Sequence, residues 1–213
     1  MSTLKLATNA LHAGHDVTAN GGTRAVPIYQ TTSYVFNNSD HAANLFSLQE
    51  LGFIYTRLNN PTNQILQDRL AAVEGGIGAV VFASGTSAIS TGLLTLLKAG
   101  DHIVASSSLY GGTYNLLNVT LPRFGITTTF VDASNPESFS AAVQENTRAF
   151  FVESLGNPKL DVLDLEAISD HAKAAEVPFI VDNTVATPAL LNPIKIVTFQ
   201  NFESQSVFAL NYF

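Results

Sequence analysis

The stretch Ser84-Gly85-Thr86-Ser87 combines residue types that suit an anion-binding turn. It follows the apolar residues 79–82, which we expect to form a buried parallel strand, and it precedes a helix expected over residues 87–98. Backbone N–H groups, hydroxyl groups and the positive end of a helix dipole would meet in this turn, where a phosphate or a carboxylate would bind. A Ser or Thr that only caps the helix is an equally good explanation of the same residues.

Three later stretches carry an aromatic ring, an amide and a carboxylate. They are Tyr110-Gly111-Gly112-Thr113, Glu153-Ser154-Leu155-Gly156-Asn157-Pro158 and Asp182-Asn183-Thr184. Each has an ordinary explanation as well, because Tyr110 can belong to a turn, Asn157 can begin a loop and Asp182 can cap a helix or turn. All three stretches follow expected strands. Since open parallel sheets bind ligands beyond the carboxyl ends of their strands, we expect these side chains to meet at one edge of a sheet.

The elements that would position these side chains alternate between strands and helices. After the first strand, apolar runs predict strands over residues 102–105, 126–131, 147–153 and 178–182. Helices are expected over residues 114–123 and 164–175, and a further helix is expected to begin at Asn135-Pro136-Glu137. An earlier helix would be capped by Thr62 and stopped by Gly75-Gly76. This alternation predicts an α/β fold with a mostly parallel sheet and helices on both faces.

A phenol and a guanidinium lie two residues apart in the loop Tyr55-Thr56-Arg57-Leu58-Asn59-Asn60-Pro61-Thr62. Arginine is well shaped to hold a phosphate through paired donors, although a surface Arg beside a half-buried Tyr is the simpler explanation. Before this loop, residues 24–36 form a proline-led, aromatic stretch that we expect to be extended. Such an arm would lie on the protein's own core or across a neighbouring subunit.

Composition restricts the class of protein. The chain has 213 residues, of which 46% are hydrophobic and 13% charged, so it can bury a sizeable core and is expected to be soluble and globular. The net charge of −7 argues against nucleic acid or an anionic membrane as a partner. Without cysteine, a secretory signal or a membrane-spanning stretch, the sequence predicts a cytoplasmic protein, and its histidines lack metal-site spacing. A nucleotide-binding protein is disfavoured because Walker A and GxGxxG motifs are missing.

Taken together, five ordered motifs resemble the Cys/Met-metabolism family of pyridoxal-phosphate enzymes, which has fold type I. They are Tyr55-x-Arg57-x-x-Asn60-Pro61-Thr62, Ser84-Gly85-Thr86-Ser87-Ala88, Tyr110-Gly111-Gly112-Thr113, Glu153-Ser154-x-x-Asn157-Pro158 and Val181-Asp182-Asn183-Thr184. The resemblance covers residues 5–194 and looks most like the O-acetylhomoserine sulfhydrylase branch. It implies an extended arm over residues 1–60 that contacts a neighbouring subunit, a partial cofactor domain over residues 61–194 that is incomplete at its carboxyl end, and a divergent tail over residues 195–213.

The resemblance also implies how the motifs bind the cofactor, pyridoxal 5'-phosphate. The implied cofactor-binding residues are Tyr55, Arg57, Ser84, Gly85, Thr86, Tyr110, Asn157, Asp182 and Thr184. The N–H groups of Gly85 and Thr86 would hold the phosphate, while the first two residues of the set would reach the phosphate of the neighbouring subunit. Tyr110 would stack on the pyridine ring, Asn157 would contact the phenolic oxygen and Asp182 would pair with the ring nitrogen. A carboxylate there keeps the nitrogen protonated and makes the ring an electron sink.

In this family the catalytic base is a lysine that forms an imine with the cofactor and later moves protons. It follows a Ser-x-Thr-Lys signature downstream of the aspartate at the ring nitrogen. The tail of this sequence has no such lysine, because Val207 stands at about the expected register and Lys195 is the last lysine. The resemblance therefore implies a chain truncated before the imine lysine and inactive as given.

The function that the resemblance implies for the family is a γ-replacement on O-acetylhomoserine with sulfide or a thiol, which yields homocysteine or methionine precursors. A cystathionine γ-synthase or γ-lyase type of enzyme is the near alternative. A non-catalytic fragment, which binds cofactor or dimerises with a complete subunit, is the interpretation from a different class. The complete protein is expected to be a homodimer or homotetramer that acts on a small amino-acid substrate.

Overall fold

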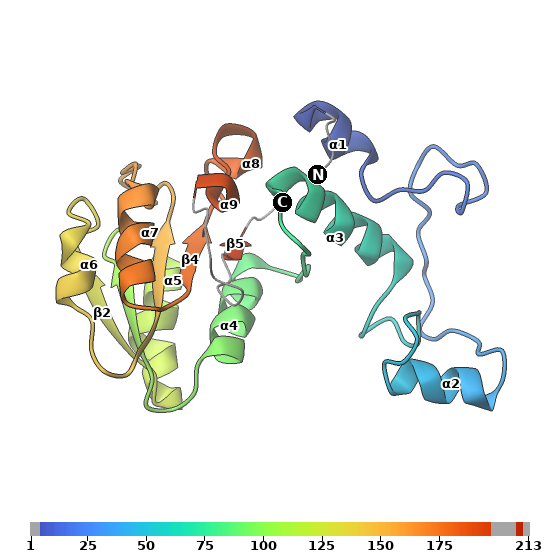
Figure 1. Cartoon of the computed structure of the whole chain (residues 1–213), viewed down its shortest axis with the longest axis horizontal. Coiled ribbons are helices and arrows are strands. Elements are labelled where there is room, and N and C mark those ends of the chain that lie inside the picture. The colour runs from blue at the N-terminus through green and yellow to red at the C-terminus, as the bar shows by residue number, and fades with distance from the viewer. Residues whose placement is uncertain (1–4, 197–207, 211–213) are drawn as a thin grey trace. The chain divides into compact units, whose positions relative to one another are not determined.

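The structure is a computed structural model that describes residues 5–196 and 208–210 (Figure 1). The chain divides into two compact units, Met1–Val81 and Phe82–Phe213. Most of the tail expected over residues 195–213, with Val207, lies outside the described residues. In the part of the chain that is described, no helix is both long and apolar enough to cross a membrane.

The first unit contains three helices among its described residues. They are α1 (Leu6–His12), α2 (Ser39–Phe46) and α3 (Pro61–Glu74). The expectation that Thr62 caps α3 was wrong, because the side chain of Asn60 accepts the hydrogen bond from the Thr62 N–H at 2.9 Å. Pro61 then occupies the first helical turn, where its missing N–H has no cost. The helix ends as expected at Gly75, which has a φ of 78°.

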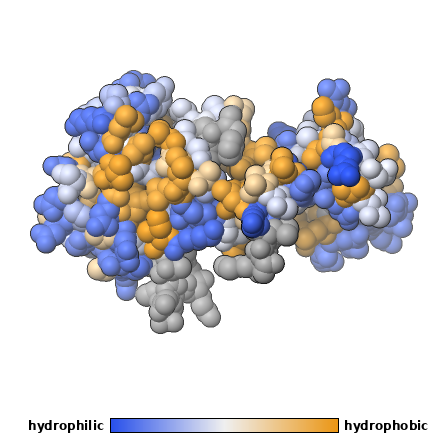
Figure 2. All heavy atoms as spheres, turned by 90° about the horizontal axis from the view of Figure 1, so that it is seen from above, coloured by the Kyte–Doolittle hydropathy of each residue, from blue (hydrophilic) through white to orange (hydrophobic). Residues whose placement is uncertain are grey.

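Residues 24–36 lack helix, in agreement with the expected arm. Hydrogen bonds join this arm to the amino end of α3. The Asn60 side chain donates to the Tyr29 carbonyl at 2.9 Å, and the Tyr29 N–H donates to the Thr62 hydroxyl at 3.0 Å. Several large hydrophobic side chains of this unit are exposed, including Ile28 and Val35, and hydrophobic surface is visible among the hydrophilic side chains in Figure 2.

The second unit is built on one parallel sheet. Among the described residues the sheet has five strands in the order β2-β1-β3-β4-β5 (Figure 1). They are β1 (His102–Ser106), β2 (Thr127–Val131), β3 (Thr147–Glu153), β4 (Phe179–Asp182) and β5 (Phe208–Leu210). In the register of β3 and β4, Glu153 pairs with Asp182. Their side chains therefore leave the sheet together at its carboxyl edge.

Helices pack on both faces of this sheet. The helix α5 (Gly111–Asn115) continues into η1 (Leu116–Thr120) and η2 (Leu121–Phe124). One buried cluster joins α4 (Gly85–Leu96), η1 and η2 to the sheet, and a second joins α6 (Glu137–Ala141) and α7 (Leu165–Ala174) to it. In β3, Ala149 and Phe151 belong to the first cluster, whereas Phe150 and Val152 belong to the second. This alternation buries both faces and confirms the predicted α/β fold. The short helices α8 (Thr187–Leu190) and α9 (Pro193–Ile196) follow β4.

The prediction of a strand over residues 79–82 was wrong. These residues have no regular secondary structure, and Val80 is 72% exposed. An apolar run becomes a strand only beside another strand that completes its backbone hydrogen bonds, and no described strand pairs with this run. The Val81 N–H donates instead to the Gln67 side chain at 3.2 Å. The helix that follows begins at Gly85, two residues earlier than expected.

His102 is buried at the amino end of β1, the opposite edge of the sheet from Glu153 and Asp182. Its Nδ1 lies 2.9 Å from the Thr147 hydroxyl and its Nε2 lies 2.9 Å from the Thr129 hydroxyl. Burial lowers the pKa of His102 below its ordinary value of 6.5, so the folded protein favours a neutral ring.

We expect the contribution of His102 to the free energy of unfolding to fall as the pH drops below 6.5, because the unfolded chain then binds a proton that folded His102 resists. The loss should not exceed about 1.4 kcal/mol per pH unit, and it should end below the folded pKa. Urea unfolding between about pH 7.5 and 5 measures it. The variant His102→Gln should lose less stability than the wild type over this pH range. Equal losses in the two proteins would contradict this assignment.

Candidate functional site

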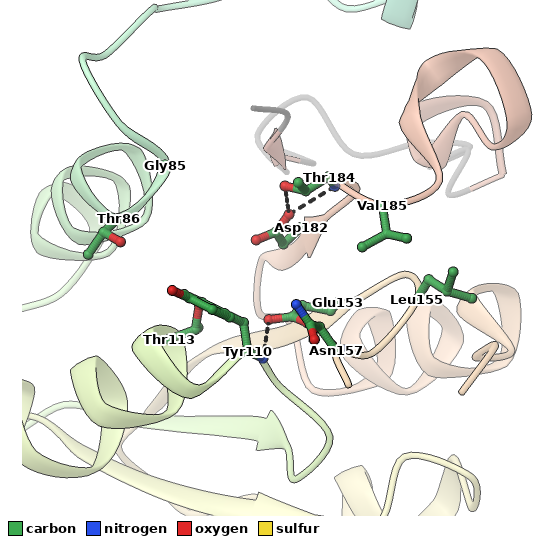
Figure 3. A pocket seen from close by; sticks show the side chains of 10 residues that line it. All are labelled: Gly85, Thr86, Tyr110, Thr113, Glu153, Leu155, Asn157, Asp182, Thr184 and Val185. Atoms are coloured by element: carbon green, nitrogen blue, oxygen red, sulfur yellow. Dashed lines mark hydrogen bonds between the residues drawn. The ribbon is translucent and has the colours of Figure 1, made fainter. Parts of the chain in front are cut away.

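A cavity of about 380 Å³ lies in the second unit, at the carboxyl edge of the sheet (Figure 3). Its size falls within the range of roughly 300–1,000 Å³ that is usual for small-molecule sites. Its lining residues are Gly85, Thr86, Tyr110, Thr113, Glu153, Leu155, Asn157, Asp182, Thr184 and Val185. Segments that follow β1, β3 and β4 thus meet the first turn of α4 at one place, as the rule for open parallel sheets requires.

The amino end of α4 forms one side of the cavity (Figure 3). Ser84 caps this helix: its hydroxyl accepts from the Ser87 N–H at 3.2 Å and lies 2.9 Å from the Ser87 hydroxyl. The ordinary capping explanation therefore holds for Ser84, which is not a lining residue. Gly85 and Thr86 do line the cavity. The first N–H groups of an α-helix have no partner within the helix, so this end suits an anion.

Tyr110 stands at the start of α5 and lines the cavity. Its ring lies against Gly112, because a Cβ atom built on Gly112 would be only 2.5 Å from Cε1 of Tyr110. A Cβ on Gly111 would meet nothing within 4 Å. Gly112 is therefore required for the observed position of the ring, whereas Gly111 is not.

Asp182 is a buried carboxylate at the end of β4, 6% exposed. Its Oδ1 accepts from the Thr184 N–H at 3.0 Å and from the Thr184 hydroxyl. The next residue is anchored as well, since the Asn183 side chain accepts from the Ser154 hydroxyl at 2.7 Å and donates to the Leu191 carbonyl at 2.8 Å. These bonds hold the strand end, and Asp182 with it, in one conformation.

Glu153 is a second buried carboxylate, 5% exposed, at the end of the neighbouring strand β3. Its Oε1 accepts from the Tyr110 N–H at 2.7 Å, and its Oε2 accepts from the Asn157 N–H at 3.2 Å. Burial raises the pKa of Glu153, the two backbone hydrogen bonds oppose this rise, and the charge of Asp182 adds to it.

Tyr55 and Arg57 belong to the first unit and are not among the lining residues of this cavity. The guanidinium carbon of Arg57 lies 5.6 Å from the centre of the Tyr55 ring, a distance typical of a cation–π contact. Tyr55 also forms an isolated antiparallel bridge with Ser33, which joins the loop to the extended arm.

The structure brings most of the predicted site residues together. Gly85, Thr86, Tyr110, Asn157, Asp182 and Thr184 line one cavity. Four lining residues were not predicted as site residues, namely Thr113, Glu153, Leu155 and Val185. The signal for Glu153 was present in the sequence, because a carboxylate directly follows the apolar residues 149–152 at the edge where ligands bind. What each residue does to a ligand stays a prediction.

The chemistry of these groups fits the three parts of pyridoxal phosphate. A helix amino end suits the phosphate, a tyrosine ring suits the flat pyridine ring, and a buried carboxylate suits a protonated ring nitrogen. Figure 3 places Gly85 and Thr86 on one side of the cavity and Asp182, Glu153 and Asn157 on the other. The charged lining residues are Glu153 and Asp182, so that side favours a cationic group.

Comparison with known proteins agrees with this fit. The model of the family described as Cys/Met metabolism PLP-dependent enzyme matches residues 7–198. The chain is 57% identical over 188 residues to an O-acetyl-L-homoserine sulfhydrylase from Leptospira meyeri, which covers 88% of this chain and 42% of the relative. It is 55% identical over 177 residues to a homocysteine synthase from Schizosaccharomyces pombe, which covers 83% of this chain and 41% of that protein.

A crystal structure of an O-acetylhomoserine (thiol)-lyase from Campylobacter jejuni, which contains a pyridoxyl-lysine phosphate, superimposes with a TM-score of 0.87 at 44% identity. The match covers 91% of this chain and 48% of that one. The chain thus spans less than half the length of these relatives. Because the family model matches residues 7–198 of the 213-residue chain, the chain belongs to the Cys/Met metabolism family of pyridoxal-phosphate-dependent enzymes.

Proposed function

We propose that this chain is the cofactor-binding part of an enzyme that replaces the acetate of O-acetylhomoserine with sulfide or a thiol. The observation that supports the cofactor site most is the convergence of the α4 amino end, Tyr110 and Asp182 on one cavity. The names of the sulfhydrylase relatives support the substrate and the product, homocysteine or a related thioether. In this reaction the bond between Cγ and the ester oxygen breaks, acetate leaves and a bond from Cγ to sulfur forms.

Pyridoxal phosphate, when bound, supplies an electron sink that stabilises negative charge on the substrate carbons. In this proposal the N–H groups of Gly85 and Thr86 hold the phosphate, and the Tyr110 ring fixes the plane of the pyridine ring. Asn157 orients the phenolic oxygen. Asp182, held by Thr184, keeps a proton on the ring nitrogen through its negative charge.

We assign the role of the proton-transferring base to no residue of the 213-residue chain. Its lysines are Lys5, Lys98, Lys159, Lys173 and Lys195, and none lines the described cavity. Lys173 lies on α7 and its Nζ is 3.0 Å from an oxygen of Asp170. We infer that the family's lysine, which removes and returns protons at the substrate carbons, is missing from this sequence.

We also propose that the first unit contacts a second subunit and that Tyr55 and Arg57 reach the cofactor phosphate there. The exposed side chains Ile28, Val35 and Leu48 support an interface, because large exposed apolar groups favour association. The guanidinium of Arg57 suits a phosphate. Sedimentation equilibrium tests the first step: a dimer or tetramer is expected, and Arg57→Ala should weaken cofactor binding in it. A monomer at every concentration, or unchanged binding in Arg57→Ala, would contradict the proposal.

Titration of the chain with pyridoxal 5'-phosphate, followed by its visible circular dichroism, tests the cofactor site. The variant Gly112→Ala should bind about two- to tenfold more weakly, because the new Cβ displaces the Tyr110 ring and an aromatic contact is worth about 0.5–1.5 kcal/mol. Gly111→Ala is the matched control: it lies in the same helix and has open space for its Cβ. A wild-type chain that gives no signal at millimolar cofactor would reject the proposed site. Equal weakening in both variants would reject the role of the ring.

A further inference from the structure

We infer that Glu153 is a positioning residue whose carboxylate holds the Tyr110 segment and the Asn157 segment at a fixed separation. The two hydrogen bonds are properties of the protein alone. That a bound cofactor requires this separation rests on the proposed function.

The two segments come from different parts of the sheet. Tyr110 follows β1 and lies 43 residues before Glu153, whereas Asn157 follows Glu153 by four residues. One carboxylate accepts both N–H groups, one on each oxygen. The same buried carboxylate thus holds the backbone of two segments whose side chains line the cavity (Figure 3).

The segments also approach each other closely beside this carboxylate. A Cβ atom on Gly156 would be 2.6 Å from the Ser108 hydroxyl and 3.0 Å from the Ser108 carbonyl oxygen. The Ser108 hydroxyl donates to Asp161 at 2.8 Å, across the same junction. A small change in the separation of the two segments would therefore break several contacts together.

The ionised form of Glu153 is needed to accept both backbone N–H groups. A carboxylate accepts on both oxygens, whereas the amide of glutamine has one acceptor and one donor group. In the variant Glu153→Gln one backbone N–H must face an NH2 group, so one of the two segments is released although the side chain keeps its size. Glu153→Asp keeps the charge but is shorter by one methylene group, and it should hold only one segment.

Amide hydrogen exchange of the cofactor-free chain, measured by NMR, tests the inference directly. In the wild type, the N–H groups of Tyr110 and Asn157 should exchange more slowly than in an unstructured chain. In Glu153→Gln at least one of the two should exchange about tenfold faster or more, since a hydrogen bond to a charged group is lost. Amides inside β3, such as that of Phe150, report global opening and should change less.

Asp101→Asn is the matched control. Asp101 is also a buried carboxylate that accepts a backbone hydrogen bond, from the Lys98 N–H at 2.8 Å, and it lies at the opposite edge of the sheet. This variant should change the exchange of Tyr110 and Asn157 no more than that of Phe150. If Glu153→Gln does not fold, hydrogen exchange of the wild type alone tests the inference. Unprotected amides at Tyr110 and Asn157 would then exclude the two hydrogen bonds.

A titration with pyridoxal 5'-phosphate separates this inference from the proposed function. We expect Glu153→Gln to bind the cofactor about tenfold more weakly and with an altered visible circular dichroism, while Asp101→Asn binds like the wild type. If the wild type binds cofactor but Glu153→Gln leaves both amides protected, the inference is wrong and the proposed function stands. If the wild type binds no cofactor, the proposed function fails, while selective exchange at the two amides still supports Glu153 as the group that joins the segments.

Discussion

Borohydride added to this chain with pyridoxal 5'-phosphate will trap no site-specific pyridoxyl-lysine adduct, and the mixture will release no acetate from O-acetylhomoserine and sulfide. Covalent catalysis of this type needs a lysine amine next to the cofactor carbonyl. The five lysines of the chain do not line the described cavity, and the resemblance to the family predicts its lysine near residue 207, which is a valine in this sequence. The expected effect is a complete loss relative to an active enzyme.

Mass spectrometry after proteolysis measures the adduct, and a coupled assay measures acetate. The O-acetyl-L-homoserine sulfhydrylase of Leptospira meyeri, which is 57% identical over 188 residues, serves as the active control. Scattered low labelling of several surface lysines is compatible with the prediction. An adduct confined to Lys195, together with acetate release, would overturn it and would identify a catalytic lysine outside the family register.

Replacement of Asp182 by asparagine should weaken binding of pyridoxal 5'-phosphate by about 10- to 100-fold, since a hydrogen bond to a charged group is worth about 1.5–3 kcal/mol. The variant keeps the shape of the side chain and can still accept from the Thr184 N–H. It loses the charge that favours a proton on the ring nitrogen. Nitrogen-15 NMR of labelled cofactor should therefore show a protonated ring nitrogen in the wild type and a neutral one in the variant.

The matched control for this variant is Asp101→Asn. Asp101 is also a buried carboxylate that accepts a backbone N–H, but it lies at the opposite edge of the sheet and does not line the cavity. Its substitution should leave both the affinity and the nitrogen signal unchanged. The free energy of unfolding should distinguish the electronic role from a structural one, because Asp182→Asn should unfold at nearly the wild-type urea concentration. Unchanged binding and a protonated nitrogen in Asp182→Asn would remove Asp182 from the proposed site.

The alternation of apolar and polar runs was enough to predict most of the second unit. The strand over residues 147–153 was predicted with its observed bounds, because its central residues 149–152 are apolar and buried on both faces of the sheet. The helix over residues 114–123 was also predicted, but the structure divides it into α, π and 3-10 segments. Pro122 has no N–H to donate within an α-helix, so the last turn tightens around it.

The amino-acid sequence alone predicts the motifs and the common edge at which the strands before Tyr110, Asn157 and Asp182 end, because parallel strands joined by helices all end on the same side. It did not determine that residues 79–82 stay outside the sheet, since strand formation depends on a neighbour that is distant in the sequence. Nor did it identify Glu153 as the acceptor of two backbone N–H groups. That role depends on the distance between segments 43 residues apart, and only the packing of β1 beside β3 sets this distance.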